Sequence, residues 1–316
     1  MNRSIGWGIA NGIAAGALWG VVFLAPAMLA SFRADQLSAG RYLVYGLIAV
    51  VLLAPRWRQL RGRLGMAEWR GLLWLSLAGN LVYFLLLATA VQWAGGAAAS
   101  LIVGLIPVVV TLAGVREEGA VPLRRLAPAL LLCLCGVALV GYEALQAEHA
   151  EGSAAQRLLG LLCAIGALFS WAVYSIGNSR WLARRPDLSG HDWSLLTGVA
   201  TGALALLLVP TAFFAGTPAH PPAQWGLFWL ASAGVAVVAS VLGNACWNRA
   251  SRHLPLTLTG QMIVFETLFA LLYYGFAWQQ RWPTHIEAVA IVCLVSGVLL
   301  CAHAHRPPRA VAEHAG

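Results

Sequence analysis

The chain has 316 residues, of which 60% are hydrophobic and only 10% are charged, whereas about 25% are charged in an ordinary soluble domain. All twenty of its basic residues are arginine. Because the chain has no lysine, it contains neither the lysine of a phosphate-binding loop nor a Schiff-base lysine, which argues against an ATP-driven pump and against enzymes of those kinds.

Apolar segments recur from one end of the chain to the other. A membrane helix needs about 20 apolar residues to cross a hydrocarbon core of roughly 30 Å. Charged or proline-rich breaks divide the sequence into ten such segments, which predicts an all-α membrane protein with ten transmembrane helices. They lie at residues 5–29, 37–54, 69–92, 95–115, 124–142, 158–179, 193–213, 224–247, 255–277 and 286–303. Nine further spans after the first argue against a secreted protein with a cleaved signal.

The arginines gather in alternate loops. Sixteen fall on one side of the predicted membrane, including the block at 56–70, and only Arg33, Arg157 and Arg281 fall on the other. Cytoplasmic loops carry the excess of arginine in membrane proteins. The distribution therefore predicts that both termini are cytoplasmic, and the net charge of +8 is a signal of topology rather than a nucleic-acid-binding patch.

The two halves of the chain echo each other weakly. AAGALWG at 14–20 matches AIGALFS at 164–170, and GVALV at 136–140 matches GVLLC at 297–301. Five spans per half mean that the second copy enters the membrane from the opposite side, and inverted repeats are a transporter architecture. Chance similarity among alanine- and leucine-rich helices is the alternative. We expect a first repeat at 1–145, a periplasmic linker at 146–157, a second repeat at 158–305 and a cytoplasmic tail at 306–316.

Several longer stretches resemble a known family. SAGRYLVYGLIAV at 38–50, AGNLVYFLLLATAVQ at 78–92 and IVFETLFALLY at 263–273 resemble the EamA-type members of the drug/metabolite transporter superfamily, and the similarity runs over nearly the whole chain. The resemblance implies ten helices in two inverted five-helix repeats, a cytoplasmic N-terminus, a bacterial inner membrane and the export of small metabolites such as amino acids. It assigns no substrate.

Two ionisable residues lie well inside the predicted spans, Glu266 and Arg41. A charge there costs about 2.5–3.5 kcal/mol on insertion scales, and such residues mark functional sites by default. Glu266 is therefore a candidate for proton coupling or for binding a substrate amine. In the alternative interpretation it is a structural pin between helices, with Arg41 as its ion-pair partner, unless Arg41 extends to the headgroups instead.

Polar and aromatic residues at similar depth are candidates for lining a substrate cavity. We predict substrate binding by Trp19, Asn80, Tyr83, Trp171, Tyr174 and Asn178, with Trp247 as a further candidate. Interhelical hydrogen bonding is the alternative role for the amides, and packing is the alternative for the rings. Glycine and proline weaken two helices in corresponding places of the two halves, which points to a transport site. The predicted gating residues are Gly104, Pro107, Pro255 and Gly260.

These features favour a secondary active transporter of a small neutral or zwitterionic solute, an amino acid or derivative first. Proton coupling and direction stay open, as does facilitated uniport or exchange of a nucleobase or sugar. A channel should show rings of charge or a repeated filter, and a scaffold needs no central acid. The six cysteines form no CxxC pair and the histidines fall at span ends or in loops, so we expect no metal site, no cofactor and no enzyme. The sequence leaves the oligomeric state open.

Overall fold

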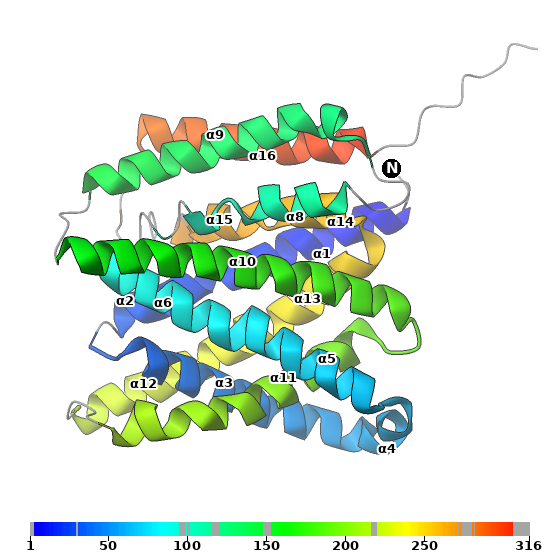
Figure 1. Cartoon of the computed structure of the whole chain (residues 1–316), viewed down its shortest axis with the longest axis vertical. Helices are drawn as coiled ribbons and strands as arrows, with labels where there is room; N and C mark the ends of the chain where they lie inside the picture. The colour runs from blue at the N-terminus through cyan, green and yellow to red at the C-terminus, as the bar shows by residue number, and fades with distance from the viewer. Residues whose placement is uncertain are drawn as a thin grey trace, which may run out of the picture.

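The computed structural model describes the chain in a series of ranges: residues 3–29, 31–94, 99, 102–115, 121–147, 153–215, 220–270, 272–273, 280 and 282–305. Regular structure in these ranges is entirely helical (Figure 1). Six helices among them are long and apolar enough to cross a membrane. The predicted all-α class is therefore confirmed for the described part of the chain.

The first half of the chain follows the predicted segments closely. Its elements are α1 (Arg3–Gly20), η1 (Val21–Phe23), α2 (Leu24–Met28), α3 (Ala34–Leu53), η2 (Ala54–Arg56), α4 (Trp57–Leu60), η3 (Arg61–Arg63), α5 (Met66–Ser76), η4 (Leu77–Val82), α6 (Tyr83–Ala94), α8 (Ile106–Gly114) and α9 (Leu123–Ala147). The element η4 is π-helical, so one predicted span, 69–92, is an α-helix with an irregular centre. Part of the predicted span 95–115 lies outside the described residues.

The main helices of the second half follow in the same order, although the short elements between them differ. This half comprises α10 (Ala154–Arg184), α11 (Gly190–Ala205), η5 (Leu206–Leu208), η6 (Pro210–Phe214), α12 (Pro222–Val235), η7 (Ala236–Gly243), α13 (Asn244–His253), α14 (Leu256–Met262), α15 (Val264–Ala270) and α16 (His285–Ala304). The elements η6 and η7 are both π-helical. The η7 element interrupts the span that holds the same place in this half as η4 holds in the first. The end of the predicted span 255–277 lies outside the described residues.

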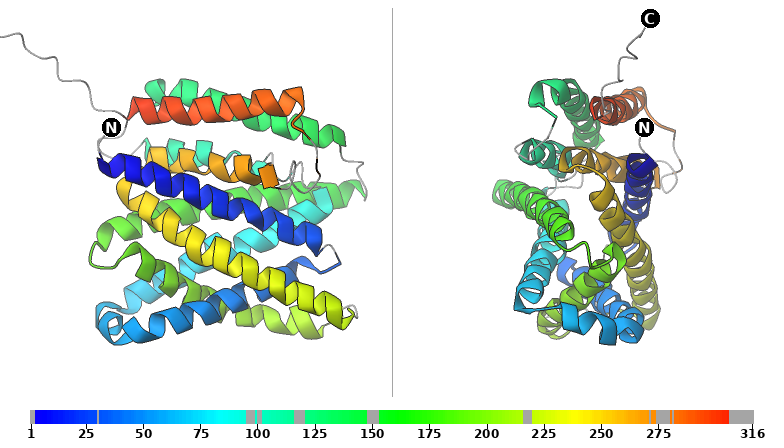
Figure 2. Two further views of the ribbon diagram at one scale, coloured as in Figure 1. Left: turned by 180° about the vertical axis from the view of Figure 1, so that it is seen from behind. Right: turned by 90° about the vertical axis from the view of Figure 1, so that its right-hand side faces the viewer.

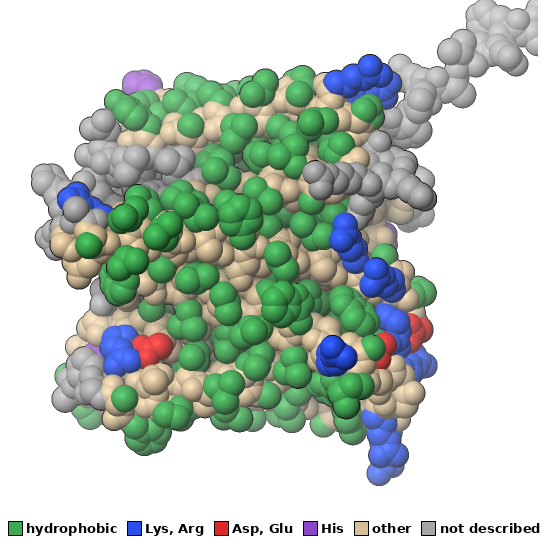
Figure 3. Space-filling model, viewed as in Figure 1, with side chains coloured by type: hydrophobic (Ala, Val, Ile, Leu, Met, Phe, Trp, Pro, Cys, Tyr) green, Lys and Arg blue, Asp and Glu red, His purple; other side chains and the backbone are tan. Residues whose placement is uncertain are grey.

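The helices run side by side, so that the connecting loops gather at two opposite ends (Figures 1 and 2). The α1 helix begins and α16 ends at the same end of the bundle. Large apolar side chains cover the face between the two ends that Figure 3 shows. Among the exposed apolar residues are Leu47, Leu131 and Leu299. Such a belt would be unfavourable in water, and lipid is the solvent that suits it.

The main helix contacts join one half to the other. The α3 helix packs on α11, α8 on α14, and α9 on α16. In addition α6 packs on α10, and α13 packs on α1. If each helix is replaced by its counterpart in the other half, every contact in this set becomes either the same contact or another contact of the set. The core of the molecule is therefore the surface between the halves rather than a separate core in each.

Glycine permits the closest of these approaches. A Cβ atom on Gly46 in α3 would lie 2.6 Å from the Cα of Gly202 in α11, so the two backbones touch without an intervening side chain. The α9–α16 contact is reciprocal in the same way. A Cβ on Gly136 would lie 2.6 Å from Leu294, and a Cβ on Gly297 would lie 2.6 Å from Cys133. Small residues at such interfaces let membrane helices gain van der Waals contact.

Ion pairs hold the loops at the arginine-rich end. Arg56 pairs with Asp192 at 2.7 Å. Arg185 pairs with Asp187 at 2.8 Å and also with Glu68 at the start of α5. Hydrogen bonds from the Arg185 guanidinium lower the pKa of the Asp187 carboxyl to about 2, and the same contacts raise the pKa of Arg185. Ion pairs therefore stabilise this end of the bundle, whereas close helix packing stabilises the middle of the bundle.

Candidate functional site

Three tryptophans from three helices meet at the centre of the bundle. The ring centroids of Trp19 in α1, Trp171 in α10 and Trp247 in α13 lie 5.2–5.8 Å apart. Tyr83 and Tyr174 extend this group, at 6.5 and 5.8 Å from Trp171. All five rings are buried. The structure thus brings together the four aromatic residues among the predicted substrate-binding set, together with Trp247, and we call these five the aromatic centre.

Two glycines make room for the rings. A Cβ on Gly79 in η4 would lie 2.2 Å from the ring of Tyr174, and a Cβ on Gly243 in η7 would lie 2.7 Å from Nε1 of Trp19. No larger residue fits at either place without moving a buried ring. The Trp19 indole N–H donates to the carbonyl of Ala239 at 3.1 Å, within η7. π-Helical segments are frequent at functional sites, and η4 and η7 both lie against the aromatic centre; η6 is π-helical as well.

The two predicted amides lie beside this centre and are engaged between helices. Asn80 Nδ2 donates to Thr201 Oγ1 at 3.1 Å. Asn178 Nδ2 donates to Asn248 Oδ1 at 2.8 Å, and Asn178 Oδ1 accepts the indole N–H of Trp193 at 2.9 Å. Both side chains are buried. These contacts are the interhelical hydrogen bonds that were the alternative to ligand binding, and a substrate role for the amides stays a prediction.

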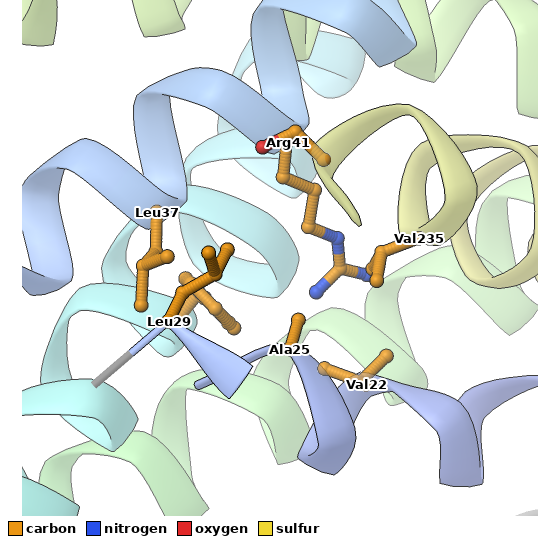
Figure 4. Close-up of a pocket in the computed structure, with 8 residues that line it drawn as sticks. Val22, Ala25, Leu29, Leu37, Arg41 and Val235 are labelled. Carbon is orange, nitrogen blue, oxygen red and sulfur yellow. The ribbon is translucent and has the colours of Figure 1, made fainter. Parts of the chain in front are cut away.

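Arg41 projects from α3 into a small cavity (Figure 4). Its Nε donates to Ser240 Oγ in η7 at 3.1 Å. The guanidinium carbon lies 5.0 Å from the ring centroid of Tyr42 and 5.3 Å from that of Phe84. Cation–π contacts of this kind stabilise a desolvated guanidinium by about 2 kcal/mol. Arg41 is therefore held by two rings and a hydroxyl of the bundle.

Glu266 lies in α15, just after a break between helices. Ile263 separates α14 from α15, and the backbone N–H of Glu266 donates to its carbonyl at 2.9 Å. The α1 helix packs directly on this break, because a Cβ on Gly16 would lie 2.5 Å from Phe265. The Glu266 side chain interacts electrostatically with Arg41. Within the described ranges, however, no salt bridge joins the two side chains.

The four predicted gating residues lie near helix ends and contacts. Gly104 is in a turn, and Pro107 is the second residue of α8, where a missing backbone N–H costs nothing. Pro255 caps the start of α14 rather than interrupting a helix, and the break in this span falls at Ile263. Gly260 packs closely on α8, because a Cβ at this position would lie 3.0–3.1 Å from side-chain atoms of that helix. Whether these residues gate anything stays a prediction.

Sequence reasoning missed two features of this region. The hydroxyls of Ser240 and Ser232 lie near Arg41, one as its hydrogen-bond partner and the other in the cavity wall. The Gly-Asn pairs at 79–80 and 243–244 hold the same place in the two halves. The repeated Gly-Asn dipeptide can be read from the sequence, and it could have indicated that these two positions are equivalent. In the described residues no group of histidine, cysteine and acidic side chains is arranged to hold a metal ion.

The fold and the site define a class: a helical protein built to lie in a membrane, whose two halves meet around a buried aromatic centre. The EamA-like transporter family matches residues 6–142 and again residues 158–302. The chain therefore belongs to that family, as the sequence resemblance predicted.

Named relatives and a solved structure agree with this assignment. The chain is 32% identical to the inner membrane protein YtfF of Escherichia coli (strain K12), over 97% of this chain and 98% of the relative. It is 23% identical to an uncharacterized transporter of Archaeoglobus fulgidus, over 77% of this chain and 80% of the relative. One crystal structure, 20% identical, superposes with a TM-score of 0.68 over 93% of this chain and 98% of the other, which shows a shared fold.

Proposed function

We propose that the protein is a secondary carrier of a bacterial inner membrane, which exports a small neutral or zwitterionic metabolite by alternating access. An amino acid or derivative is the first candidate cargo. Membership of a transporter family supports the proposal, as does the inner-membrane relative. The family and the transporter relative also favour a carrier over an enzyme. No cofactor is needed for this function, and the partners are the solute and the lipid bilayer.

The observation that carries the proposal is a pair of equivalent contacts, in each of which a ring from one half packs on a glycine of the other half. Tyr174, from the first helix of the second half, lies on Gly79 in the first half. Trp19, from the first helix of the first half, lies on Gly243 in the second half. Inverted repeats that meet at the bilayer midplane can exchange conformations, and the exchange opens a central site to each side in turn. The two π-helical segments beneath these rings are the points at which we expect the spans to bend.

The distribution of charge supports a ten-helix topology with both termini in the cytoplasm. Arginine side chains gather along one end of the bundle (Figure 3), the end at which α1 begins and α16 ends. The positive-inside rule assigns that end to the cytoplasm. On this basis the first repeat spans 1–145, the periplasmic linker 146–157, the second repeat 158–305 and the cytoplasmic tail 306–316.

Glu266 is the proposed coupling residue, either as a proton carrier or as the ligand of a substrate amine. Its support is its position: it follows a helix break, α1 packs on that break, and its charge interacts with Arg41 without a salt bridge among the described residues. One proton driven across 100 mV supplies about 2.3 kcal/mol. At complete coupling this sustains a substrate gradient of roughly fifty-fold.

Transport by purified protein in liposomes tests the proposal. Radiolabelled amino acids, nucleobases and sugars are offered under an imposed pH gradient and membrane potential, and we expect an amino acid to accumulate. Glu266→Gln should fold normally and lose accumulation. The matched control is Glu68→Gln, which makes the same chemical change in an acid paired with Arg185 at a helix start and should keep accumulation.

Each alternative predicts a different result in the same vesicles. Downhill flux that ignores the proton gradient would indicate a uniporter or exchanger, and accumulation of a nucleobase or sugar would change the cargo. Currents far above carrier rates would indicate a channel. If no solute moves although the protein is folded, the carrier function is wrong and a scaffold replaces it. A Glu266→Gln protein that melts well below the wild type would identify Glu266 as a structural pin.

A further inference from the structure

We propose that Arg41 binds the carboxylate group of the solute, so that the cargo is a small monocarboxylate with an apolar remainder. Apolar amino acids belong to this class, whereas sugars and nucleobases do not. The inference rests on the proposed function, since it names the chemistry of the solute that the carrier moves. It also assigns Arg41 a ligand instead of a permanent ion-pair partner.

The hydrogen bonding of Arg41 is incomplete. A guanidinium group has five N–H donors, and the described residues provide one acceptor, Ser240 Oγ, for its Nε. In the same ranges neither Nη1 nor Nη2 donates to a protein atom, and no carboxylate forms an ion pair with Arg41. Figure 4 shows these two nitrogens turned toward the side of the cavity where Ala25, Val22 and Val235 lie. The paired donors that bind a carboxylate are therefore directed at open space.

The orientation of the guanidinium is fixed in advance. Tyr42 and Phe84 lie 5.0 and 5.3 Å from its central carbon, and the bond to Ser240 sets its rotation. A preorganised fork of donors loses little entropy when it binds an anion. An arginine at this depth is costly, and such residues mark substrate pathways. Glu266 interacts with Arg41 electrostatically, but among the described residues no carboxylate forms a salt bridge with it. A ligand carboxylate would supply that direct partner.

The cavity next to Arg41 selects among anions. Its walls are apolar, formed by Val22, Ala25, Leu29, Leu37 and Val235, with the hydroxyl of Ser232 as a second polar group. Its volume is about 20 Å³, and one water needs roughly 10–15 Å³ on this measure. In this conformation the space is about the size of one water, so a carboxylate head together with its apolar tail fits only when the cavity widens. Phosphate or sulfate carries more charge and needs more donors than one guanidinium and one hydroxyl provide.

The cavity also lies between the two halves of the chain. Val22 and Ala25 come from η1 and α2, Arg41 comes from α3, and Ser232 and Val235 come from α12. Because residues of both halves line the cavity, a ligand held there by Arg41 would contact both halves at once. A site in that position is exposed to one side or the other when the halves change their relative conformation.

Isothermal titration of the purified full-length protein tests the inference with matched probes. Butyrate and butyramide have nearly the same shape and differ in charge, and leucine and leucinamide form a second pair. We expect each carboxylate to bind at least tenfold more tightly than its amide. Arg41→Gln should abolish that preference, and Arg41→Lys should keep part of it, because an ammonium carries the charge without the fork. Arg58→Gln, at an exposed position in α4, should bind as the wild type does.

A second variant keeps the test decisive if Arg41→Gln does not fold. Ala25→Leu fills the cavity and leaves the guanidinium intact, and it should weaken butyrate binding at least tenfold. Equal binding of butyrate and butyramide by the wild type would overturn the inference, as would full butyrate affinity in either variant or no carboxylate binding at all. If the liposomes transport solutes without preferring carboxylates, the inference about Arg41 is wrong and the carrier function stands. If carboxylates bind but no solute is transported, the carrier function is wrong and the inference about Arg41 stands.

Discussion

The contact between Gly46 and Gly202 offers a stability test whose magnitude follows from the structure. A Cβ placed on Gly46 lies 2.6 Å from the Cα of Gly202, whereas ordinary contacts begin at 3.4 Å, so Gly46→Ala must separate α3 from α11 by about 0.8 Å. The obstacle is backbone and cannot rotate away. Overpacking of this kind costs about 1–3 kcal/mol, and we expect the upper end. The better helix propensity of alanine returns about 1 kcal/mol, which leaves a net loss of about 2 kcal/mol.

Gly226→Ala is the matched control, because a Cβ at Gly226 in α12 meets nothing within 4 Å. It should be neutral or more stable by up to about 1 kcal/mol. Unfolding of both variants in the same mixed micelles, followed by circular dichroism against denaturant, measures the difference, which we expect to be about 2–3 kcal/mol. If Gly46→Ala is as stable as Gly226→Ala, the direct backbone contact between the halves is absent and the reasoning fails.

Three further outcomes are expected. Asn178→Ala removes hydrogen bonds to α11 and α13 and should cost about 1–3 kcal/mol in the same unfolding assay; an unchanged midpoint would show that these bonds contribute nothing. Trp19→Phe removes the N–H that donates to Ala239 and part of the ring that packs on Trp171 and Trp247, so it should cost more than the roughly 0.6 kcal/mol of the hydrogen bond alone; an unchanged midpoint would contradict both contacts. The Asp187 carboxyl has a pKa lowered from 3.8 to about 2 by Arg185, so its ion pair is fully formed above pH 4 and is lost as the pH falls through 2. Asp187→Asn should therefore lower the melting temperature at pH 6 and lower it much less at pH 2, where half of the folded-state carboxyls are protonated. An equal effect at both values would contradict the ion pair.

Much of the candidate site could be predicted from spacing, but its bonding could not. Trp19, Tyr83, Trp171 and Tyr174 were identified because each lies near the middle of an apolar span, and depth along a span can be read from position alone. Their neighbours in space were not readable in this way. The partner of Asn178, for example, is Asn248, seventy residues further along the chain.

Arg41 shows the same limit. The sequence marked it as costly and left two partners open, Glu266 or the headgroups. The packing of α3 against η7 and α6 places it against Ser240 and the rings of Tyr42 and Phe84, which the sequence did not indicate. The position of the break is a further example, because Pro255 lies at the start of α14 and the break in this span falls at Ile263. Local rules fix what a residue permits, and tertiary contacts select among the permitted outcomes.

The sequence by itself determined that this is a helical membrane protein of the EamA-like family with an asymmetric distribution of arginine. Hydropathy and charge act along the chain, since each span must satisfy its own backbone hydrogen bonds in lipid. Only the tertiary structure decided which spans touch, because lipid tails are as apolar as the helices and hydrophobicity therefore does not choose partners. Close packing at glycine and a few buried hydrogen bonds make that choice, and they set the position of Arg41 beside its cavity.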